Sequence, residues 1–220
     1  MWRAQIFTLY PEIYPGLLGK GLYGKALQNK LWDLTVTNIR DAAEDKHKTV
    51  DDTPFGGGSG MLLKADVLAK SIDQNKKKNE RIFYLSPKGK KLDQKLAIEL
   101  SKEKSISLIC GHFEGVDERI LKTRNIEELS VGDFILSGGE TASFVVLDSI
   151  LRLLPGVLGN EHSKKEESFE NGLLEYPQYT KPQIWEEKSV PDVLLSGDHS
   201  KIKDWRLSQS EAITRDRRPD

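Results

Sequence analysis

The chain has 220 residues and a mass of 24.8 kDa, enough for one core domain with a small appendage but too little for two domains of ordinary size. It carries 33 Lys and Arg against 34 Asp and Glu, which excludes a protein that coats nucleic acid indiscriminately. Its longest apolar runs, such as 106–110 and 144–147, fall far short of the roughly 20 residues that span a bilayer, so no membrane contact is expected. A single cysteine, Cys110, and an N-terminus without a signal pattern are typical of a cytoplasmic protein.

Short apolar runs bounded by turn or polar residues predict five strands, at 5–9, 34–39, 81–85, 106–110 and 134–136. Between them, apolar residues at helical spacing predict helices over 16–29, 65–77, 92–102 and 141–154. Because strands and helices alternate, the sequence predicts an α/β fold with a largely parallel sheet.

The last part of the chain differs in composition. Residues 159–172 are polar and lack apolar periodicity, so they are predicted to form a flexible linker. Beyond them a Pro- and aromatic-rich stretch precedes a short helix predicted from Ile202 to near Thr214. The sequence therefore predicts a core domain at 1–158, a linker at 159–172 and a small helical domain at 173–220.

Positive charge is concentrated in one segment. Residues 76–104 hold ten Lys or Arg and four acidic residues, including Lys76–Lys78, Lys88, Lys90, Lys91 and Lys95. Such a run is commonly a solvated loop and helix face, and it is also the composition of a local patch that binds phosphates. The sequence alone leaves both interpretations open.

Glycine is concentrated at Gly56–Gly60, at Gly111 and Gly115, and at Gly132 with Gly138 and Gly139. The last two clusters follow predicted strands, and Ser86-Pro87-Lys88-Gly89 follows a third. Ligands of open α/β sheets bind beyond the carboxyl ends of strands, where glycine lets the backbone approach them. These loops predict one shared pocket, although any single glycine could serve a turn alone. No P-loop or G-x-G-x-x-G fingerprint is present, which argues against a kinase, an ATPase or a dinucleotide-dependent dehydrogenase.

Longer motifs carry a resemblance to a known family. They are His47–Asp52, Pro54–Met61, Tyr84–Gly89, Cys110–Arg119, Val131–Glu140, Pro155–Gly159 and Val193–His199. In this order they closely resemble the bacterial tRNA (guanine-N1)-methyltransferase family, TrmD, from residue 1 to about 219. Motifs of this length are highly specific.

The resemblance implies a SPOUT fold, in which a C-terminal trefoil knot completes the α/β sheet, and a homodimer whose subunits share the active site. It implies transfer of a methyl group from S-adenosylmethionine to N1 of guanosine-37 in tRNA, with magnesium supporting the reaction. Two other hypotheses stay open: a non-catalytic RNA-binding protein on the same scaffold, and a knotted methyltransferase with another target nucleotide.

The resemblance also assigns a pocket for the methyl donor. Its expected members are Tyr84, Leu85, Ser86, Pro87, Gly111, Glu114, Gly115, Val131, Gly132, Asp133, Phe134, Ile135, Leu136, Gly138 and Gly139. Backbone groups on glycine-lined loops can hydrogen-bond adenine, and Leu85, Val131 and Leu136 can enclose its ring. Glu114 is expected beside the methionine end of the donor, where its carboxylate could attract the sulfonium or a magnesium ion.

Guanine N1 carries a proton, so the reaction needs a base at N1 and positive charge near O6. The family has an Asp as this base, whereas the matching position here is Glu167, with Glu166 as the substitute candidate. Arg152 matches the family arginine that stabilises charge on O6, although an Arg at a helix C-terminus also favours the macrodipole.

Asp51 and Asp52 are expected to accept hydrogen bonds from the guanine edge, unless they form an ordinary turn or N-cap pair. Cys110 is interpreted as a buried strand residue, since direct methyl transfer needs no enzyme nucleophile. His47 and His112 are left out of the expected catalytic set, because lone histidines are more often structural or solvated.

Overall fold

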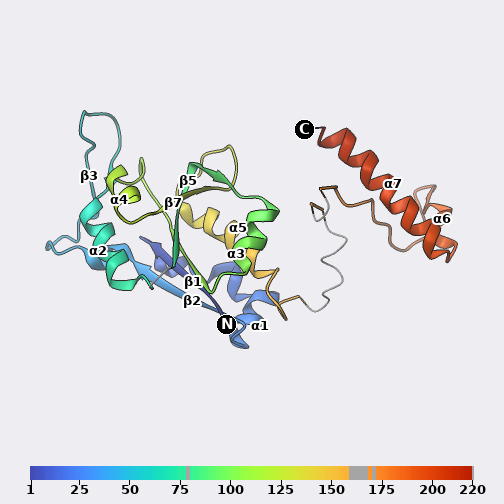
Figure 1. Cartoon of the computed structure of the whole chain (residues 1–220), viewed down its shortest axis with the longest axis horizontal. Helices are drawn as coiled ribbons and strands as arrows, with labels where there is room; N and C mark the ends of the chain where they lie inside the picture. Colours follow the sequence, from blue (N-terminus) through green and yellow to red (C-terminus); the bar gives the residue numbers. More distant parts are fainter. Residues whose placement is uncertain (78–79, 159–167, 170–171, 220) are drawn as a thin grey trace. The chain divides into compact units, whose positions relative to one another are not determined.

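The computed structural model describes residues 1–77, 80–158, 168–169 and 172–219 (Figure 1). The chain divides into two compact units, Met1–Gly159 and Asn160–Asp220. Most of the predicted linker, including residues 159–167, lies outside the described residues.

A five-stranded parallel sheet forms the centre of the first unit, in the order β2-β1-β6-β5-β7. Its strands are β1 (Trp2–Thr8), β2 (Trp32–Asn38), β5 (Arg81–Lys91), β6 (Ser105–Ile109) and β7 (Glu127–Ser130). A separate antiparallel ribbon is formed by β3 (Asp51–Asp52) and β4 (Leu62–Leu63). The predicted α/β fold with a parallel sheet is confirmed, and the carboxyl ends of all five strands meet at one edge.

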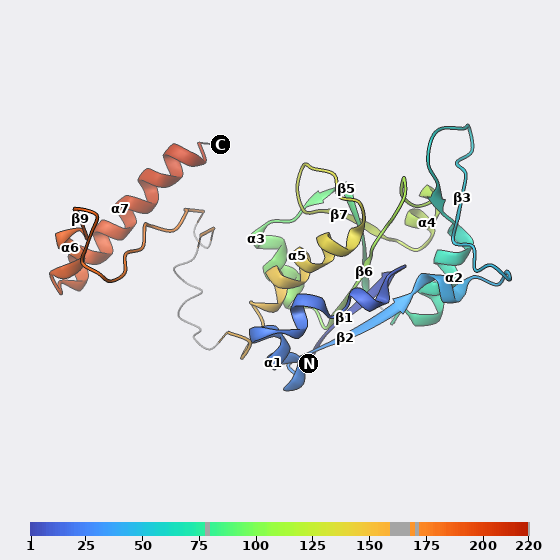
Figure 2. The ribbon, with the colours of Figure 1, turned by 180° about the vertical axis from the view of Figure 1, so that it is seen from behind.

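Helices cover both faces of this sheet. They are η1 (Pro11–Ile13), η2 (Gly16–Gly19), α1 (Gly21–Gln28), η3 (Ile39–Ala42), α2 (Ala65–Asn75), α3 (Gln94–Ser101), α4 (Glu118–Thr123) and α5 (Gly139–Leu151). One core lies between the sheet and α1, α3 and α5; the other lies between the opposite face and η3, α2 and α4 (Figures 1 and 2). Along β5, Phe83 and Leu85 enter the first core while Ile82 and Tyr84 enter the second, as the alternation of a strand requires.

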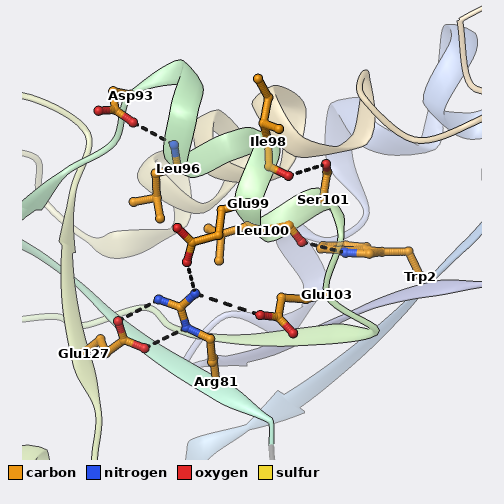
Figure 3. Close-up of polar contacts among 10 residues, drawn as sticks. All are labelled: Trp2, Arg81, Asp93, Leu96, Ile98, Glu99, Leu100, Ser101, Glu103 and Glu127. Atoms are coloured by element: carbon orange, nitrogen blue, oxygen red, sulfur yellow. Dashed lines mark hydrogen bonds and ion pairs between the residues drawn. The ribbon is translucent and has the colours of Figure 1, made fainter.

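Polar contacts hold the amino edge of the sheet to α3 (Figure 3). Arg81, the first residue of β5, donates from Nε and Nη2 to the two carboxylate oxygens of Glu127, both at 2.8 Å. Its Nη1 donates to Oε1 of Glu99 in α3 at 2.6 Å, and the indole of Trp2 donates to the carbonyl of Leu100 at 3.2 Å. These contacts lie at the amino edge of the sheet, and the candidate site lies at the opposite, carboxyl edge.

The predicted strand at 134–136 is wrong. Phe134, Ile135 and Leu136 lie in an irregular loop and are 54%, 82% and 38% exposed. The fifth strand is β7, where Glu127 and Glu128 interrupt the apolar pattern. Pairing with β5 and the contact with Arg81 stabilise β7 despite its low intrinsic strand preference.

The four helices predicted for this unit are confirmed to within a few residues, except that 16–29 divides into η2 and α1. The helix α4 was not predicted, because six residues are too few to show a helical period. Asp117 caps α4 by accepting from the backbone N–H of Arg119 at 2.9 Å.

The second unit is built on one long helix. Its elements are β8 (Ile184–Trp185), β9 (Lys188–Ser189), α6 (Asp192–Leu195) and α7 (His199–Arg217). The helix predicted over 202–214 is thus present and longer, because Asp198 caps it by accepting from the N–H groups of Ser200 and Lys201.

A cavity of about 530 Å³ lies within this second unit. Its wall includes Tyr179 and Trp205, whose ring centroids are 6.3 Å apart, and Arg206, whose guanidinium lies 4.7 Å from the ring centroid of Tyr176. Among the described residues, no helix is both long and apolar enough to cross a membrane.

Candidate functional site

Residues 84–88 of β5, where its register with β7 shifts, and the loops after β6 and β7 enclose a cavity of about 260 Å³ at the carboxyl edge of the sheet. The loop expected at Ser86–Gly89 is therefore part of β5. The cavity wall consists of Tyr84–Lys88, Gly111–Val116, Glu118, Leu121, Glu128–Gly132, Phe134–Gly139 and Ala142. This is the position at which open α/β sheets bind ligands, and it joins three segments that are far apart in the sequence.

The first wall is formed by residues 84–88 of β5 and depends on close approach to glycine. Tyr84 is buried, and a Cβ atom on Gly111 would lie 2.5 Å from its Cε2 atom, while one on Gly115 would lie 3.2 Å from its hydroxyl. Burial, together with the charge of Glu128, raises the pKa of Tyr84 to about 12, so the phenol is neutral at physiological pH. A larger residue at Gly111 would displace this ring.

The second wall follows β6 and is linked to the glycine loop at 54–60. The backbone N–H of Glu114 donates to the carbonyl of Met61 at 2.9 Å, and that of Leu63 donates to the carbonyl of Gly115 at 2.9 Å. The side chain of Glu114 lies where a Cβ on Gly60 would be, with Cγ only 2.3 Å from that position. The β3–β4 ribbon is thereby fixed to the pocket loop.

Asp51 and Asp52 form β3 and do not line the cavity. Asp51 is half-buried and Asp52 is exposed, with its Oδ1 accepting from the N–H of Thr53 at 2.7 Å. The structure therefore places both carboxylates on the ribbon that leads into the second wall.

The third wall runs from β7 to the start of α5. The N–H of Gly139 donates to the carbonyl of Gly111 at 3.0 Å, and a Cβ on Gly139 would lie 2.6 Å from the Cα of Cys110. Glycine is needed here because the first turn of α5 lies directly against the backbone after β6. Between these points, the exposed side chains of Phe134 and Ile135 form an apolar part of the wall.

Of the fifteen residues expected to form the donor pocket, fourteen line this cavity. The exception is Asp133, whose carboxylate pairs with Lys91 Nζ at 2.8 Å. The cavity wall also includes Lys88 from the basic segment, which was not assigned to the pocket. Lys88 directly follows Pro87, an expected pocket residue, and this was the sequence signal that could have placed it in the wall.

A buried polar cluster behind the wall was also missed. Glu140, the second residue of α5, accepts from Thr8 Oγ1 at 2.5 Å and lies 2.8 Å from Nε2 of His112. Nearby, the hydroxyl of Tyr14 lies 2.5 Å from Ser143 Oγ and 3.3 Å from Cys110 Sγ. The interpretation of Cys110 as a buried residue is confirmed, since it is fully inaccessible at the end of β6.

Of the expected catalytic residues, only Arg152 lies in the part of the chain that the structure describes, and it does not line the cavity. Arg152 follows the last residue of α5, whereas the cavity adjoins the first turn of that helix. At a rise of 1.5 Å per residue, the 13 residues of α5 separate these ends by about 20 Å. Glu167 and its alternative Glu166 lie outside the described residues.

The surroundings of Arg152 are those of a helix C-terminus. Its N–H donates to the carbonyl of Asp148 at 3.3 Å. Burial and the hydrogen bond to Asp148 raise the pKa of Tyr23, and the positive charge of Arg152 opposes that rise. Arg152 therefore lies close to the Tyr23–Asp148 pair.

Among the described residues, no group of three or more His, Cys, Asp or Glu is placed to hold a metal ion. The cavity instead offers backbone groups on glycine-rich loops, apolar side chains and the exposed carboxylate of Glu114. Such a wall suits a mixed polar and apolar small molecule.

Comparisons with known proteins show the family to which the chain belongs. The family model described as tRNA (Guanine-1)-methyltransferase TrmD matches residues 2–220. A protein of Pelagibacter ubique named tRNA (guanine-N(1)-)-methyltransferase is 87% identical over 220 residues, covering 100% of this chain and 96% of that protein. Proteins of the same name from Bartonella tribocorum and Brucella canis are 55% and 53% identical over 219 residues, covering 100% of this chain and 94% and 89% of their own lengths. The chain belongs to the tRNA (guanine-1)-methyltransferase TrmD family.

Proposed function

We propose that the chain transfers a methyl group from S-adenosylmethionine to N1 of guanosine-37 in tRNA. The observation that carries this proposal is the glycine-walled cavity at the carboxyl edge of the sheet, which fourteen of the fifteen expected donor-binding residues line in a chain of the TrmD family. The relatives' names support the methylated atom, guanine N1, and the kind of RNA. Position 37 follows from membership of the family.

The cavity fits the donor chemically. Its volume of about 260 Å³ is close to the lower end of small-molecule sites, and Leu85, Val131 and Leu136 supply apolar contacts for a flat ring. Loops with Gly111 and Gly138 leave backbone N–H and C=O groups accessible for hydrogen bonds. S-adenosylmethionine supplies an electrophilic methyl group when it is bound. The exposed carboxylate of Glu114 would attract the positive sulfonium end.

The chain must also remove the proton from guanine N1. We assign this role to Glu167, with Glu166 as the alternative, in place of the family's Asp. Glu and Asp have similar intrinsic pKa values, but Glu is one methylene longer, so its backbone must lie farther from the base. Asp51 and Asp52 would accept hydrogen bonds from the guanine edge, since their ribbon is fixed to the cavity wall through Leu63.

Arg152 would stabilise negative charge that develops on O6. In a single chain it lies about 15 Å along α5 from Ala142, the wall residue nearest to it on this helix, too far to reach a base held in the cavity. The distance supports a homodimer in which one subunit provides the donor pocket and its partner provides Arg152 and the Glu167 segment. The linker at 159–172 would then close over the site when tRNA binds.

Two regions are proposed to bind the RNA. The second unit, 173–220, offers a cavity with Tyr179 and Trp205 for stacking on bases and with Lys181 and Arg206 for phosphates. In the first unit, Lys88 lies at the wall of the donor cavity and extends its basic segment toward the substrate. A trefoil knot, a magnesium requirement and a cytoplasmic location complete the proposal, all on the basis of the family.

The test is methyl transfer from labelled S-adenosylmethionine to a tRNA with guanosine-37, followed by nuclease mapping of the labelled nucleotide. The matched control is the same tRNA with adenosine at position 37, which should accept no label. Label at another nucleotide, or no transfer with or without magnesium, would contradict the proposal.

The base is identified by single-turnover rates of Glu167→Gln, Glu167→Asp and Glu166→Gln. We expect Glu167→Gln to lose at least about a hundredfold in rate, as removal of a general base does, and Glu167→Asp to retain part of it. A fully active Glu167→Gln beside an inactive Glu166→Gln would move the role to Glu166.

A further inference from the structure

Glu140 connects three segments behind the donor cavity. It is only 6% exposed, and both of its carboxylate oxygens have partners. Oε1 accepts from Thr8 Oγ1 at the end of β1, at 2.5 Å, and Oε2 lies 2.8 Å from Nε2 of His112 in the loop after β6. A buried carboxylate costs free energy unless its oxygens are satisfied, and both oxygens of Glu140 are, so this geometry is strongly specified.

His112 is part of the cavity wall and is held from several sides. The ring of Tyr10 makes an edge contact with the imidazole at a centroid distance of 5.0 Å. A Cβ on Gly138 would lie 2.4 Å from its Cε1 atom. The hydrogen bond between Nε2 of His112 and Oε2 of Glu140, at 2.8 Å, holds the imidazole from a third side. The ring therefore has one position and one preferred orientation.

The loop that His112 belongs to needs such support. Phe113 has a φ of 60° and Gly115 a φ of 123°, both in the left-handed region. A non-glycine residue in that region is strained and persists only when its surroundings hold it. Apart from the backbone bonds to Met61, Leu63 and Gly139, the loop is closed by its own bond from Gly115 N–H to the carbonyl of His112, at 3.2 Å.

We propose that Glu140 is a positioning residue for the methyl donor. Through His112 it holds the 111–115 loop against the Gly138–Gly139 turn, in the shape that receives S-adenosylmethionine. This inference rests on the proposed function and adds to it a role for two residues that do not perform the chemistry.

The test compares His112→Ala, Glu140→Gln and the double variant in the full-length protein. Glu140→Gln keeps the side-chain volume and an oxygen for Thr8, so it remains informative if His112→Ala does not fold. Affinity for S-adenosylmethionine is measured by calorimetry. The kcat and the KM for the donor are measured at saturating tRNA, and the Tm is measured without ligand. The control is His199→Ala, which removes an exposed histidine of the second unit. It shows whether loss of any imidazole changes the affinity for the donor.

We expect His112→Ala to raise the Kd and the KM for the donor about tenfold, with a kcat within about twofold of the parent at saturation. Glu140→Gln should raise the Kd by a smaller factor. The double variant should bind no more weakly than His112→Ala, because the two residues act as one unit. His199→Ala should bind the donor as the parent does.

The following results would overturn the inference. A lower Tm with an unchanged Kd would make the pair purely structural. Additive effects of the two substitutions on the Kd would show that the residues act independently. A large fall in kcat at saturation would give His112 a part in the chemistry. If the parent protein itself bound no S-adenosylmethionine, the proposed function would fail and this inference with it. Unchanged binding by both single variants would overturn the inference alone.

Discussion

At the scale of single residues, Asp117 links a helix cap to the cavity wall. Its Oδ1 caps α4, its N–H donates to the carbonyl of Leu63 at 3.3 Å, and its neighbours Val116 and Glu118 line the cavity. Hydrogen bonds from Arg119 lower the pKa of Asp117 to about 2. The ionised form is therefore favoured in the folded protein.

We expect Asp117→Ala to lower the free energy of unfolding by about 1 kcal/mol at pH 7, the usual value of an N-cap. Asp117→Asn should lose less, because an amide oxygen still caps the helix and the exposed pair with Arg119 contributes little. Since the folded-state pKa is depressed, the stabilisation from ionisation is present above about pH 4 and is lost as the pH falls toward 2.

Urea unfolding of the parent and both variants between pH 7 and pH 2.5 checks this prediction. The difference between the parent and Asp117→Asn should shrink below pH 4. A difference that stays constant over the whole range would contradict the assigned linkage.

Cys110 makes a second residue-scale prediction. Burial raises the pKa of its thiol to about 12, and the side chain is fully inaccessible. We expect no reaction of the native protein with iodoacetamide at pH 8 and one modified thiol per chain in denaturant, both counted by mass spectrometry. Rapid modification of the native protein would show that the end of β6 opens readily.

At the scale of elements, the sequence predicts those parts of the site that depend on local pattern. Apolar runs followed by glycine-containing segments mark residues 86–89 of β5, where its register with β7 shifts, and the loop after β6, so the amino-acid pattern alone places the first two walls of the cavity. For the third wall, the sequence predicts the right residues but the wrong secondary structure. The apolar residues 134–136 were expected to be a strand, but they form the wall itself.

Features that depend on distant partners could not be predicted. The strand β7 contains two glutamates and is recognisable only beside β5 and Arg81. The contact between His112 and Glu140 spans 28 residues and exists because α5 begins directly against the backbone after β6. No local pattern in the sequence predicts that the start of α5 packs against this backbone.

The same approach predicts the effect of a single methyl group at the start of α5. In Gly139→Ala the added Cβ would lie 2.6 Å from the Cα of Cys110, which is backbone and cannot move aside alone. We expect a loss of about 1–3 kcal/mol in the free energy of unfolding, as for other overpacked sites, and weaker donor binding.

Thr141→Ala is the matched control, because Thr141 is exposed on the same helical turn. Urea unfolding should leave it within about 0.5 kcal/mol of the parent. Equal stability of Gly139→Ala and Thr141→Ala would mean that the helix start shifts freely and that the close approach is not required.

At the scale of the whole molecule, net charge proved a weak guide to the partner. A charge of -1 excludes an indiscriminate nucleic-acid coat but is compatible with an enzyme that binds one tRNA site. The positive charge is local, and Lys88 brings part of it to the cavity. A dimer would present this basic segment twice.

The final prediction concerns that dimer. If one subunit supplies the donor pocket and its partner the base, then Glu114→Ala and Glu167→Gln damage different halves of each site. Each variant alone should be nearly inactive. In a heterodimer of the two, one site carries both changes and the other carries neither.

Random exchange of subunits at equal amounts makes half of the dimers heterodimers, each with one intact site, so about a quarter of the parent activity should return. The experiment co-expresses the two variants and measures methyl transfer per subunit, with each variant co-expressed with itself as the control. A site built within one chain would give no recovery, because every chain would then carry one damaged residue. Recovery near a quarter would instead require that Glu114 and Glu167 act across the subunit boundary, consistent with the length of α5 that separates Arg152 from the cavity in one chain.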